Sequence, residues 1–462
     1  MRKWLKNKKW FFITGVSIII NIAGCKKLVK VDEPNDSFTS AIVFSNDSLA
    51  QTAVTGLYIK INTYTKYLLS GGMSVFTSLS GDELQRTSLM SNEEQFYQND
   101  INQNNQLINT NMWKAAYTYI YHCNSCIEGL HKSNKVSTIL KDRLTGEVKF
   151  MRALCYYYLV NLYGNVPLAL GTNADVNAML ARAPVAQVYK QMETDLVDAS
   201  DGLMNERINT APTIFAAQAL LARVYLHLKQ WDKAEQMANT LINSGQFALQ
   251  TNLNEVFLKD SKEIIFQLAP VQSGMNSPEG FVFVPLGNGK PAYNISTGLW
   301  DAFEAGDQRK DSWIKSGTIA GQPYRYPNKY KIYKSAIGSE ILEYNVVLRL
   351  AEQYLIRAEA LAHQNRVEDA VNDVNTIRAR AGLKALEKNI NNEECLDAIL
   401  QERRFEFFTE WGHRWIDLKR TDRANAVLSK VKSNWKYYDT LYPIPVSELE
   451  TAPNLEQNPG YE

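Results

Sequence analysis

The chain has 462 residues, and its 50 Lys and Arg residues nearly balance 49 Asp and Glu residues, giving a formal charge of +1. Five basic residues and no acid lie in the first 24 positions, so the charge of the remainder is five units lower, −4. Such a mildly acidic chain gives no electrostatic reason to expect a nucleic-acid partner, because nucleic-acid binding normally requires a basic surface. The 24 Tyr and 9 Trp residues can serve a core and can also stack on sugar rings.

Residues 1–24 have the pattern of a signal peptide, in which a basic segment precedes the apolar run Trp10–Ile20. This run is too short to cross a bilayer core of about 30 Å as a helix. It ends in Ile22-Ala23-Gly24-Cys25, which resembles the bacterial lipobox, although an ordinary signal peptide with a chance cysteine is the alternative. We expect Cys25 to be acylated and residues 25–35 to form a lipidated tether on a membrane surface.

Hydrophobic periodicity predicts that residues 36–462 fold mainly as α-helices. Ser45 or Asn46 can cap a first helix that continues to Ile61. Further helices are predicted over residues 113–130, 147–163, 185–204, 214–228 and 231–242. The segment 147–163 is apolar on most sides, so we expect it at the centre of the core.

An internal repeat indicates paired helices. Ala222, Leu226, Asp232, Ala234 and Ala238 have counterparts 136 positions later in Ala358, Ala362, Glu368, Ala370 and Val374. Each copy combines a helix that bears small residues, a short polar turn and an acidic start to a second helix. This arrangement resembles a tetratricopeptide unit, in which small residues let two helices approach closely.

Two stretches, residues 70–106 and about 250–345, lack the helical pattern and are rich in loops, and the second contains many Gly, Pro, Asn and Ser residues. Within the second stretch, residues 263–268 and 281–284 are predicted to be short strands. Long irregular segments inserted in a helical scaffold often form functional surfaces. The aromatic content of these two stretches favours that interpretation.

The spacing of Cys123 and Cys126, with His122 and His131 nearby, is compatible with a metal or redox site. A structural zinc site usually needs a second ligand pair, which the sequence lacks, and a redox pair would lie in a strand–helix–strand pattern. These cysteines fall inside a predicted helix. We therefore expect packed or mutually oxidised side chains, with no metal and no cofactor.

Residues 395–420 combine apolar and charged periodicity. Leu396, Ile399, Leu400 and Phe407 fall on one helical face, which we expect to be buried. The other flank carries Glu402, Glu406 and Glu410 with Arg403 and Arg404, at spacings suited to ion pairs within one helix. Gly412 is predicted to end the helix. The charges of residues 413–420 indicate a buried or half-buried ion-pair network rather than a catalytic cluster.

The segment ERRFEFFTEWGHRWIDLKR at 402–420 closely resembles the C-terminal signature of the SusD/RagB family. Further resembling blocks occur in the expected order at the lipobox and at residues 147–168, 263–268, 299–309, 347–362 and 442–461. The resemblance implies a mostly α fold of four tetratricopeptide-like helix pairs with a loop-rich region that contains a few short strands.

The resemblance also implies a non-catalytic outer-membrane lipoprotein that binds a nutrient, most often a polysaccharide or oligosaccharide. Its partner would be a SusC-like TonB-dependent transporter, over which it acts as a lid. One departure concerns surface exposure, because the acids Asp32 and Glu33 follow Cys25 later than in many surface-exposed lipoproteins.

A sugar-binding surface pairs exposed aromatic rings with amide, carboxylate or guanidinium groups. The two loop-rich stretches supply this mixture in Asp82, Glu83, Gln85, Arg86, Phe96, Tyr97, Asn99, Tyr293, Tyr324, Arg325 and Tyr326. We expect the two stretches to converge, with Tyr324 or Tyr326 stacking on a sugar and Arg86 binding its hydroxyls. Trp300 lies in a scaffold-like block, and we expect it in the core.

Two other functions remain open from the residues alone. A glycoside hydrolase could use paired carboxylates such as Asp82-Glu83 or Glu93-Glu94, although neighbouring acids in a polar loop are commonplace. A tetratricopeptide-like adaptor that binds only a protein would fit the repeats but would leave the aromatic loops without a role.

Overall fold

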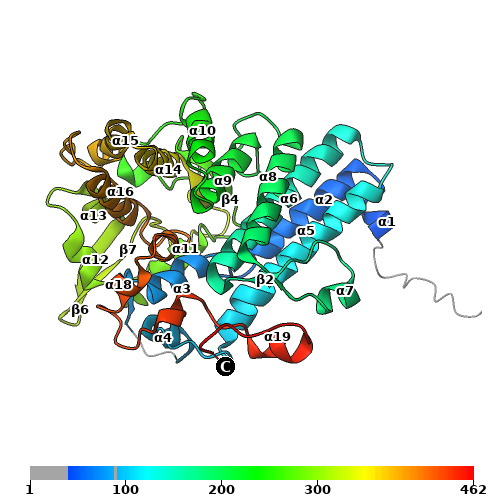
Figure 1. The fold of residues 1–462 in the computed structure, drawn as a ribbon, viewed down its shortest axis with the longest axis horizontal. Helices are drawn as coiled ribbons and strands as arrows, with labels where there is room; N and C mark the ends of the chain where they lie inside the picture. Colours follow the sequence, from blue (N-terminus) through cyan, green and yellow to red (C-terminus); the bar gives the residue numbers. More distant parts are fainter. Residues whose placement is uncertain (1–39, 88–90, 462) are drawn as a thin grey trace, which may run out of the picture.

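The computed structural model describes residues 40–87 and 91–461, so the predicted signal peptide, Cys25 and the tether lie outside the described residues. The fold is mostly helical (Figure 1). The first half of the chain contains α1 (Ser40–Val43), α2 (Asp47–Asn62), α3 (Gly72–Ser80), α4 (Ser91–Gln98), a π-helix (Leu107–Lys114), α5 (Ala115–Lys132), α6 (Thr138–Tyr163), α7 (Ala174–Ala178) and α8 (Val185–Gly202).

The second half contains α9 (Ile214–His227), α10 (Trp231–Ile242), α11 (Pro278–Phe283), α12 (Thr297–Ala302), α13 (Gln308–Trp313), α14 (Leu350–His363), α15 (Val367–Arg380), α16 (Asn392–Phe407), α17 (His413–Arg420), α18 (Ala424–Leu428) and α19 (Val446–Thr451). The strands of the described residues form antiparallel pairs: β1 (Leu84–Arg86) with β5 (Tyr293–Ile295), β2 (Val166–Pro167) with β3 (Arg182–Ala183), β4 (Ile264–Leu268) with β8 (Asn345–Arg349), and β6 (Ile314–Ile319) with β7 (Gln322–Pro327).

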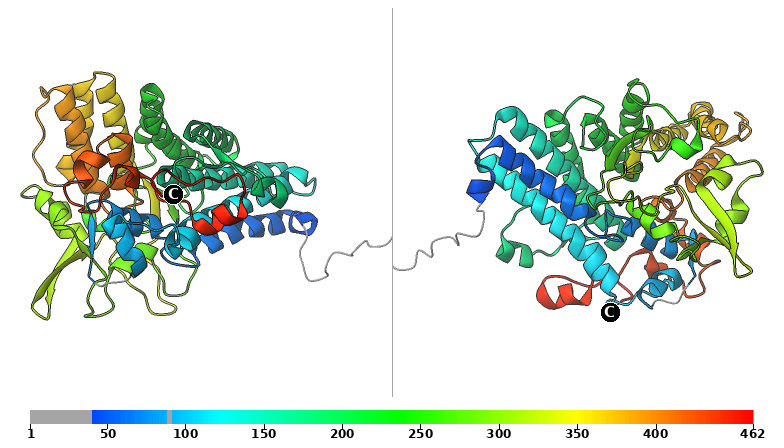
Figure 2. Two further views of the ribbon diagram at one scale, coloured as in Figure 1. Left: turned by 60° about the horizontal axis from the view of Figure 1, so that its bottom comes forward. Right: turned by 180° about the vertical axis from the view of Figure 1, so that it is seen from behind.

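The long helices α2, α5, α6 and α8 lie at one end of the molecule, and the β6–β7 hairpin projects at the other (Figures 1 and 2). Of the two predicted caps, Asn46 is the N-cap of α2, since its side chain accepts a hydrogen bond from Leu49 N at 3.0 Å. Helix α6 begins at Thr138, earlier than the predicted start at residue 147. Its first turns are polar and partly exposed, so they lack the apolar pattern on which the prediction was based. None of the helices in the described ranges is both long and apolar enough to span a bilayer.

The predicted helix pairs are confirmed. Helices α9 and α10 form one pair and α14 and α15 the other, with starts offset by the same 136 positions as the repeat. The small residues Ala222, Ala234, Ala358 and Ala370 have no exposed surface, which lets the paired helices approach closely. Helix α10 packs against α14, so the two pairs stack on each other.

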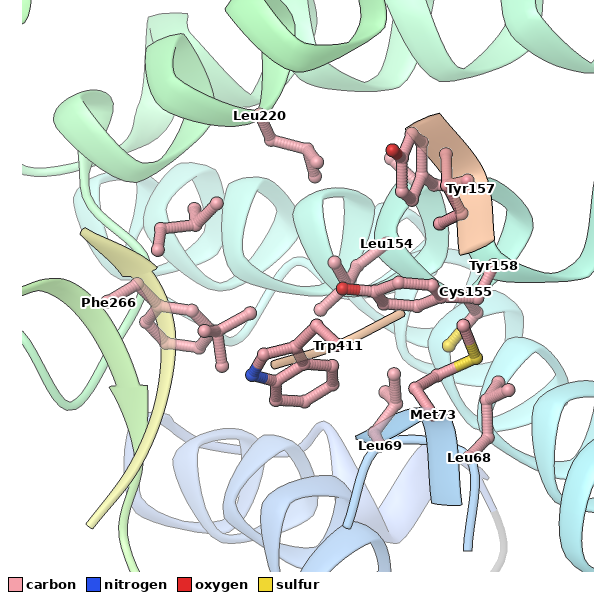
Figure 3. Close-up of a cluster of buried hydrophobic side chains, with 14 of the residues drawn as sticks. Leu68, Leu69, Met73, Leu154, Cys155, Tyr157, Tyr158, Leu220, Phe266 and Trp411 are labelled. Atoms are coloured by element: carbon pink, nitrogen blue, oxygen red, sulfur yellow. The ribbon is translucent and has the colours of Figure 1, made fainter. Parts of the chain in front are cut away.

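Helix α6 supplies the centre of the core, as its apolar circumference predicted. Tyr158 of α6 stacks on Trp411, with ring centroids 5.6 Å apart and an interplanar angle of 20°. Figure 3 shows these rings among side chains from α3, α9 and β4, including Met73, Leu220 and Phe266. Segments far apart in the sequence therefore share one core.

Several expectations about local structure were wrong. Residues 281–284 belong largely to helix α11 rather than a strand, because Ser277 caps that helix through Gly280 N at 2.9 Å and Pro278 suits its first turn. The stretch 70–106 contains two helices, α3 and α4. Helix α3 is buried throughout, so it shows no polar face that would mark a helical period.

The 395–420 segment also differs in detail. Helix α16 ends at Phe407, and Gly412, with φ of +75°, precedes α17 instead of ending α16. Glu402 and Glu406 are buried and pair with arginines of other elements rather than within their own helix. The network predicted for residues 413–420 is present, since Asp417 accepts from Arg403 and from Arg420, each at 2.7 Å.

The cysteines at 123 and 126 have buried, free thiols in α5. Burial raises the pKa of Cys126 to about 11, so this thiol stays protonated at neutral pH. Across the described residues, no group of three or more His, Cys, Asp or Glu side chains is placed to hold a metal ion.

Candidate functional site

The two loop-rich stretches meet at a short sheet. Strand β1 pairs with β5 so that Arg86 lies opposite Tyr293 and Leu84 lies opposite Ile295. The hairpin packs beside this sheet, and Arg325 N in β7 donates to the Asn294 side-chain oxygen at 3.2 Å. Candidate residues from positions 82–99 and 293–326 therefore occupy neighbouring elements.

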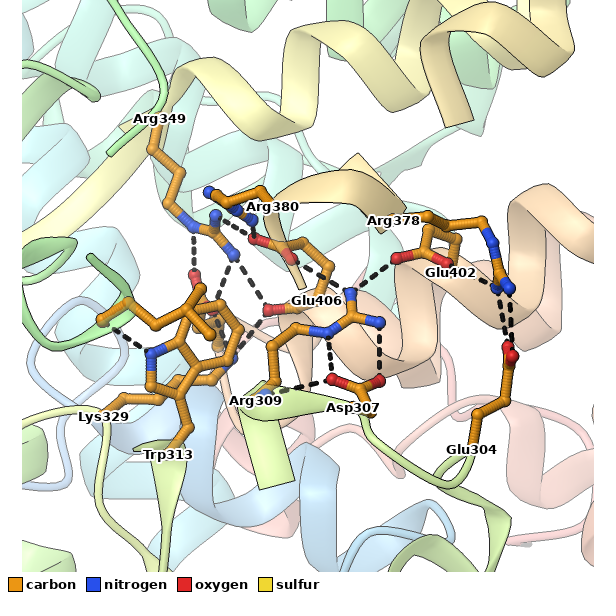
Figure 4. Close-up of polar contacts among 12 residues, drawn as sticks. Glu304, Asp307, Arg309, Trp313, Lys329, Arg349, Arg378, Arg380, Glu402 and Glu406 are labelled. Atoms are coloured by element: carbon orange, nitrogen blue, oxygen red, sulfur yellow. Dashed lines mark hydrogen bonds and ion pairs between the residues drawn. The ribbon is translucent and has the colours of Figure 1, made fainter. Parts of the chain in front are cut away.

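An ionic cluster holds the base of the hairpin (Figure 4). Arg309, in the helix that leads into β6, has no exposed surface and donates to Glu402 at 2.6 Å and to Glu406 at 3.1 Å. Lys329, just after β7, donates to the Glu406 carbonyl at 2.8 Å and also to the Glu410 carboxylate. Both ends of the hairpin are thus tied to α16 and the turn that follows it.

The charges in this cluster compensate one another. Arg349 of β8 binds the Glu406 carboxylate at 2.5 Å, and Arg380 of α15 binds the same group. Burial alone would raise the pKa of Glu406, but the guanidinium groups of Arg380, Arg349 and Arg309 hold it well below its usual range. Burial lowers the pKa of Lys329 to about 8, so this group remains mainly charged at neutral pH.

The acids proposed at positions 82 and 83 serve internal contacts. Asp82 accepts from Arg414 at 2.8 Å and from Arg404 at 2.9 Å, which joins the first stretch to α16 and α17. Glu83 is buried and accepts from Ser78 Oγ at 2.7 Å, and burial raises its pKa to about 7. Both carboxylates are therefore held in contacts within the protein and are not free to bind a ligand from solvent.

Three other candidates are also buried. The Tyr293 hydroxyl donates to Glu93 at 2.8 Å, and Arg86 forms an ion pair with the same carboxylate while lying 5.8 Å from the Tyr293 ring centroid. Asn99 takes a left-handed conformation, φ +52°, and donates to the Ser80 carbonyl at 3.0 Å. These side chains brace the loops from inside.

Two of the three remaining candidates, Tyr97 and Tyr326, lie nearer the surface. Tyr97 is half-buried, with Lys432 Nζ 4.2 Å from its ring centroid. Tyr324 is 8% exposed with Lys290 Nζ 5.3 Å from its ring centroid, whereas Tyr326 is half-buried. Because Tyr324 and Tyr326 alternate with Arg325 along β7, the two rings share one face of the hairpin.

The position of Trp300 differs from the expectation that this residue lies in the core. It is half-buried rather than enclosed in the core, and Lys310 Nζ and the Arg325 guanidinium lie 4.1 and 4.3 Å from its ring centroid. Cations over an indole ring are attracted by its π-face, so Lys310 and Arg325 stabilise Trp300 in this position. Sequence reasoning missed Lys310, since no local motif connects it with Trp300. We call Trp300, Tyr324 and Tyr326 the hairpin aromatics.

Two hollows lie away from these aromatics. A cavity of about 240 Å³ lies among α9, α14, α16 and α17, beside the stacked rings of Trp231 and His363, whose centroids are 3.9 Å apart. A cavity of about 400 Å³ lies between α4 with the residues that follow it and the C-terminal tail, next to Tyr438 and Tyr461. We call the second one the tail cavity.

Comparisons with known proteins agree with this architecture. A SusD-like family model, described as starch-binding and associating with the outer membrane, matches residues 31–226, and the SusD family model matches residues 296–461. SusD-like protein P2 of Formosa agariphila is 25% identical over 98% of this chain and 100% of its own length.

Solved structures share the fold. A SusD superfamily protein of Bacteroides vulgatus superposes with a TM-score of 0.78 at 21% identity, covering 90% of this chain and 99% of its own. A laminarin-binding SusD-like protein superposes with a TM-score of 0.74 at 23% identity, covering 90% of this chain and 100% of its own. The chain therefore belongs to the SusD/RagB family, whose members are non-catalytic binding proteins associated with the outer membrane.

Proposed function

We propose that this protein is a cell-surface lipoprotein that binds a glycan and delivers it to a TonB-dependent, SusC-like transporter. The observation that carries the proposal is the pairing of β1 with β5, which gathers the aromatic-bearing loops of two distant stretches on one family scaffold. Family members are described as starch-binding, and one structural relative as laminarin-binding. A neutral glucan is accordingly the first ligand to test.

The hairpin chemistry supports sugar recognition. A pyranose offers C–H groups on its faces and hydroxyls round its edge, which suit an aromatic ring beside polar groups. Tyr326 provides a partly accessible ring on one face of the hairpin, and on the other face Arg325 and Lys310 provide donors next to Trp300. The buried candidates Asp82, Glu83, Arg86, Asn99 and Tyr293 then act by holding the loops. Contact with the sugar falls to Tyr324 and Tyr326 on one face of the hairpin or to Trp300 beside Arg325 on the other, with Tyr97 on α4.

The placement of the acids also argues against hydrolysis. Asp82 is occupied by two arginines and Glu83 is buried against Ser78, so this pair lacks the facing, accessible geometry of a general acid and its partner. A protein-binding adaptor built on the helix pairs would need no hairpin aromatics. Of the three functions, glycan binding is the one that gives the hairpin aromatics a role.

Titration calorimetry of purified protein against maltohexaose, laminarihexaose and a peptide library tests the ligand class. Alanine at Tyr97, Tyr324, Tyr326 or Trp300 should weaken glycan binding by about 1–3 kcal/mol where the side chain is a hot spot. Tyr121→Ala is the matched control, because Tyr121 is 50% exposed on α5. Unchanged affinity in all four variants would place the site elsewhere, and release of reducing sugar would contradict a pure binding function.

Anchoring and partnering have separate tests. Cys25→Ala should release the protein from membranes, because acyl chains supply the proposed attachment. A fully membrane-bound Cys25→Ala protein would contradict the lipoprotein proposal. Native mass measurement after gentle solubilisation should show a complex with an outer-membrane barrel, and a preparation that contains only monomer would contradict the transporter partnership.

A further inference from the structure

The tail cavity has the chemistry of a ligand site that the proposed function does not use. It lies where the segment after α4 meets the last residues of the chain, and its volume is about 400 Å³. None of the hairpin aromatics lines it. Helix α4 nevertheless contributes to both regions, since Glu93 binds Tyr293 while Gln95 faces the cavity.

Two tyrosines form an aromatic corner in this cavity. The rings of Tyr438 and Tyr461 meet edge to face, with centroids 5.4 Å apart and an interplanar angle of 72°. The Tyr461 hydroxyl donates to the Leu441 carbonyl at 2.9 Å, which fixes its ring. Gly460, with φ of +90°, packs its backbone against the Tyr438 ring, because a Cβ at this position would lie 2.4 Å from Cγ of that ring.

Three side-chain amides on the cavity wall are oriented by the protein. Gln95 Oε1 accepts from Asn102 N at 3.0 Å, and Asn102 Oδ1 accepts from Asn104 N at 2.8 Å. Gln103 Oε1 accepts from Gln457 Nε2 at 3.0 Å. The amide nitrogens of all three make no hydrogen bond within residues 40–87 and 91–461. Each amide therefore holds its oxygen against the protein and keeps two donors available.

Acceptors complete the lining. Asp100 and Asp439 contribute carboxylates, and Asp439 is held by the Lys436 amide, which donates to it at 2.6 Å. The Asp100 side chain is 70% exposed, and its carboxylate lies 3.7 Å from Lys436 Nζ. An exposed ion pair of this kind is weak, so a ligand can displace it. The cavity thus offers oriented donors, acceptors and two rings around one space.

We propose that the tail cavity is a second carbohydrate site, for an uncharged oligosaccharide. Amide donors and carboxylate acceptors match the alternating roles of sugar hydroxyls, and the tyrosine rings match the apolar face of a pyranose. The carboxylates of Asp100 and Asp439 outnumber the ammonium group of Lys436 in the lining, so the cavity disfavours uronic acids and sulfated sugars. A glycan long enough to reach both regions gains avidity from the two sites.

The test is calorimetric titration of the full protein with maltohexaose, laminarihexaose and mannohexaose, and with hexagalacturonate as the acidic probe. Tyr438→Ala should remove one class of sites or weaken it about tenfold, equivalent to about 1.4 kcal/mol. Asn102→Asp should act similarly, because it keeps the acceptor for Asn104 N but loses the donor. Tyr121→Ala and Asn104→Asp are the matched controls and should change affinity less than about twofold, since neither side chain lines the cavity.

The outcomes separate this inference from the proposed hairpin site. Loss of a site in Tyr438→Ala and Asn102→Asp, with the control variants unchanged, supports the inference whatever the hairpin variants do. Wild-type binding that both Tyr438→Ala and Asn102→Asp leave unchanged overturns the inference and leaves glycan binding intact. Tyr438-dependent binding of hexagalacturonate overturns the assignment of an uncharged ligand. A wild-type protein that binds none of the probes overturns this inference and the proposed glycan function together.

Discussion

The helix pairs and the base of the hairpin are both buried, but opposite kinds of contact hold them. In the pairs α9–α10 and α14–α15, alanines with no exposed surface let helices approach closely. At the hairpin base, Arg309 and Glu406 are equally buried, yet their contact is an ion pair between residues 97 positions apart. The first region depends on side-chain size and the second on charge balance.

This difference separates stability from positioning. Close packing of small apolar groups removes hydrocarbon from water and stabilises the fold directly. A buried ion-pair cluster adds little net stability, because desolvation of the charges offsets their attraction. Its contribution here is geometric, since Arg309 and Lys329 tie the two ends of the hairpin that carries Tyr324 and Tyr326.

The largest expected effect comes from unbalancing the charge. Glu406→Gln leaves three arginines facing a neutral group, and we expect it to lower the free energy of unfolding by about 3–5 kcal/mol. Denaturant titration measures this loss. Glu368→Gln is the control, since its pair with Lys388 is exposed, and its cost should stay below about 1 kcal/mol. Equal costs for the two variants would contradict the dependence on charge balance.

The helix pairs should respond to size instead. Ala370→Leu on α15 inserts methyl groups into a closed interface and should cost about 1–3 kcal/mol of unfolding free energy. Ala379→Leu on the same helix is the control, because Ala379 is exposed and should tolerate the change. A similar Tm for both variants would show that this interface is loosely packed.

A smaller effect should depend on pH. Glu279 is buried against Ser74, and burial raises its pKa from 4.5 to about 7. Between about pH 4.5 and 7 the folded state holds a proton that the unfolded state releases, so this group lowers stability as the pH rises through that window. Glu279→Gln should therefore stabilise the protein at pH 8 by on the order of 1 kcal/mol and leave stability unchanged at pH 4. A variant less stable than wild type at pH 8 would contradict this sign.

The smallest effect tests the exposed edge of the hairpin. Lys290 is exposed above the Tyr324 ring, and Lys290→Met should change the unfolding free energy by no more than about 0.5–1 kcal/mol, as expected for a solvated cation–π contact. Thermal denaturation measures the change. A loss as large as that of Glu406→Gln would mean that charge also stabilises the hairpin surface.

The two regions also differed in how far the sequence predicted them. The 136-residue offset predicted both helix pairs, because small residues at helical spacing report a close crossing locally. The ionic cluster was predicted only as pairs within one helix, since nothing local to Glu406 indicates Arg309 or Arg349. Helix α3 was missed for a related reason: it is buried on every side, so it lacks the polar face that makes a helical period visible.

For the candidate site, the sequence predicted which stretches converge but not which side chains face outward. Tyr293 and Arg86 both occur in polar, loop-like segments, yet Glu93 holds them inside. Trp300 occurs in a scaffold-like block and still reaches the surface under Lys310 and Arg325. Exposure in loops depends on partners supplied by other segments, which local composition does not encode.

The burial of α3 has a consequence for how the protein matures. Its Ser74 hydroxyl accepts from Trp411 N at 3.1 Å, and Ser80 at its end shares a hydrogen bond with the Tyr442 hydroxyl at 2.9 Å, across 362 positions of sequence. The N-terminal part of the core therefore closes only after almost the whole chain has been synthesised. Contacts of such long range slow folding and leave apolar segments open to aggregation until they form. Fragments that stop before Trp411 should be chaperone-dependent and sensitive to proteases, however stable the isolated helix pairs are.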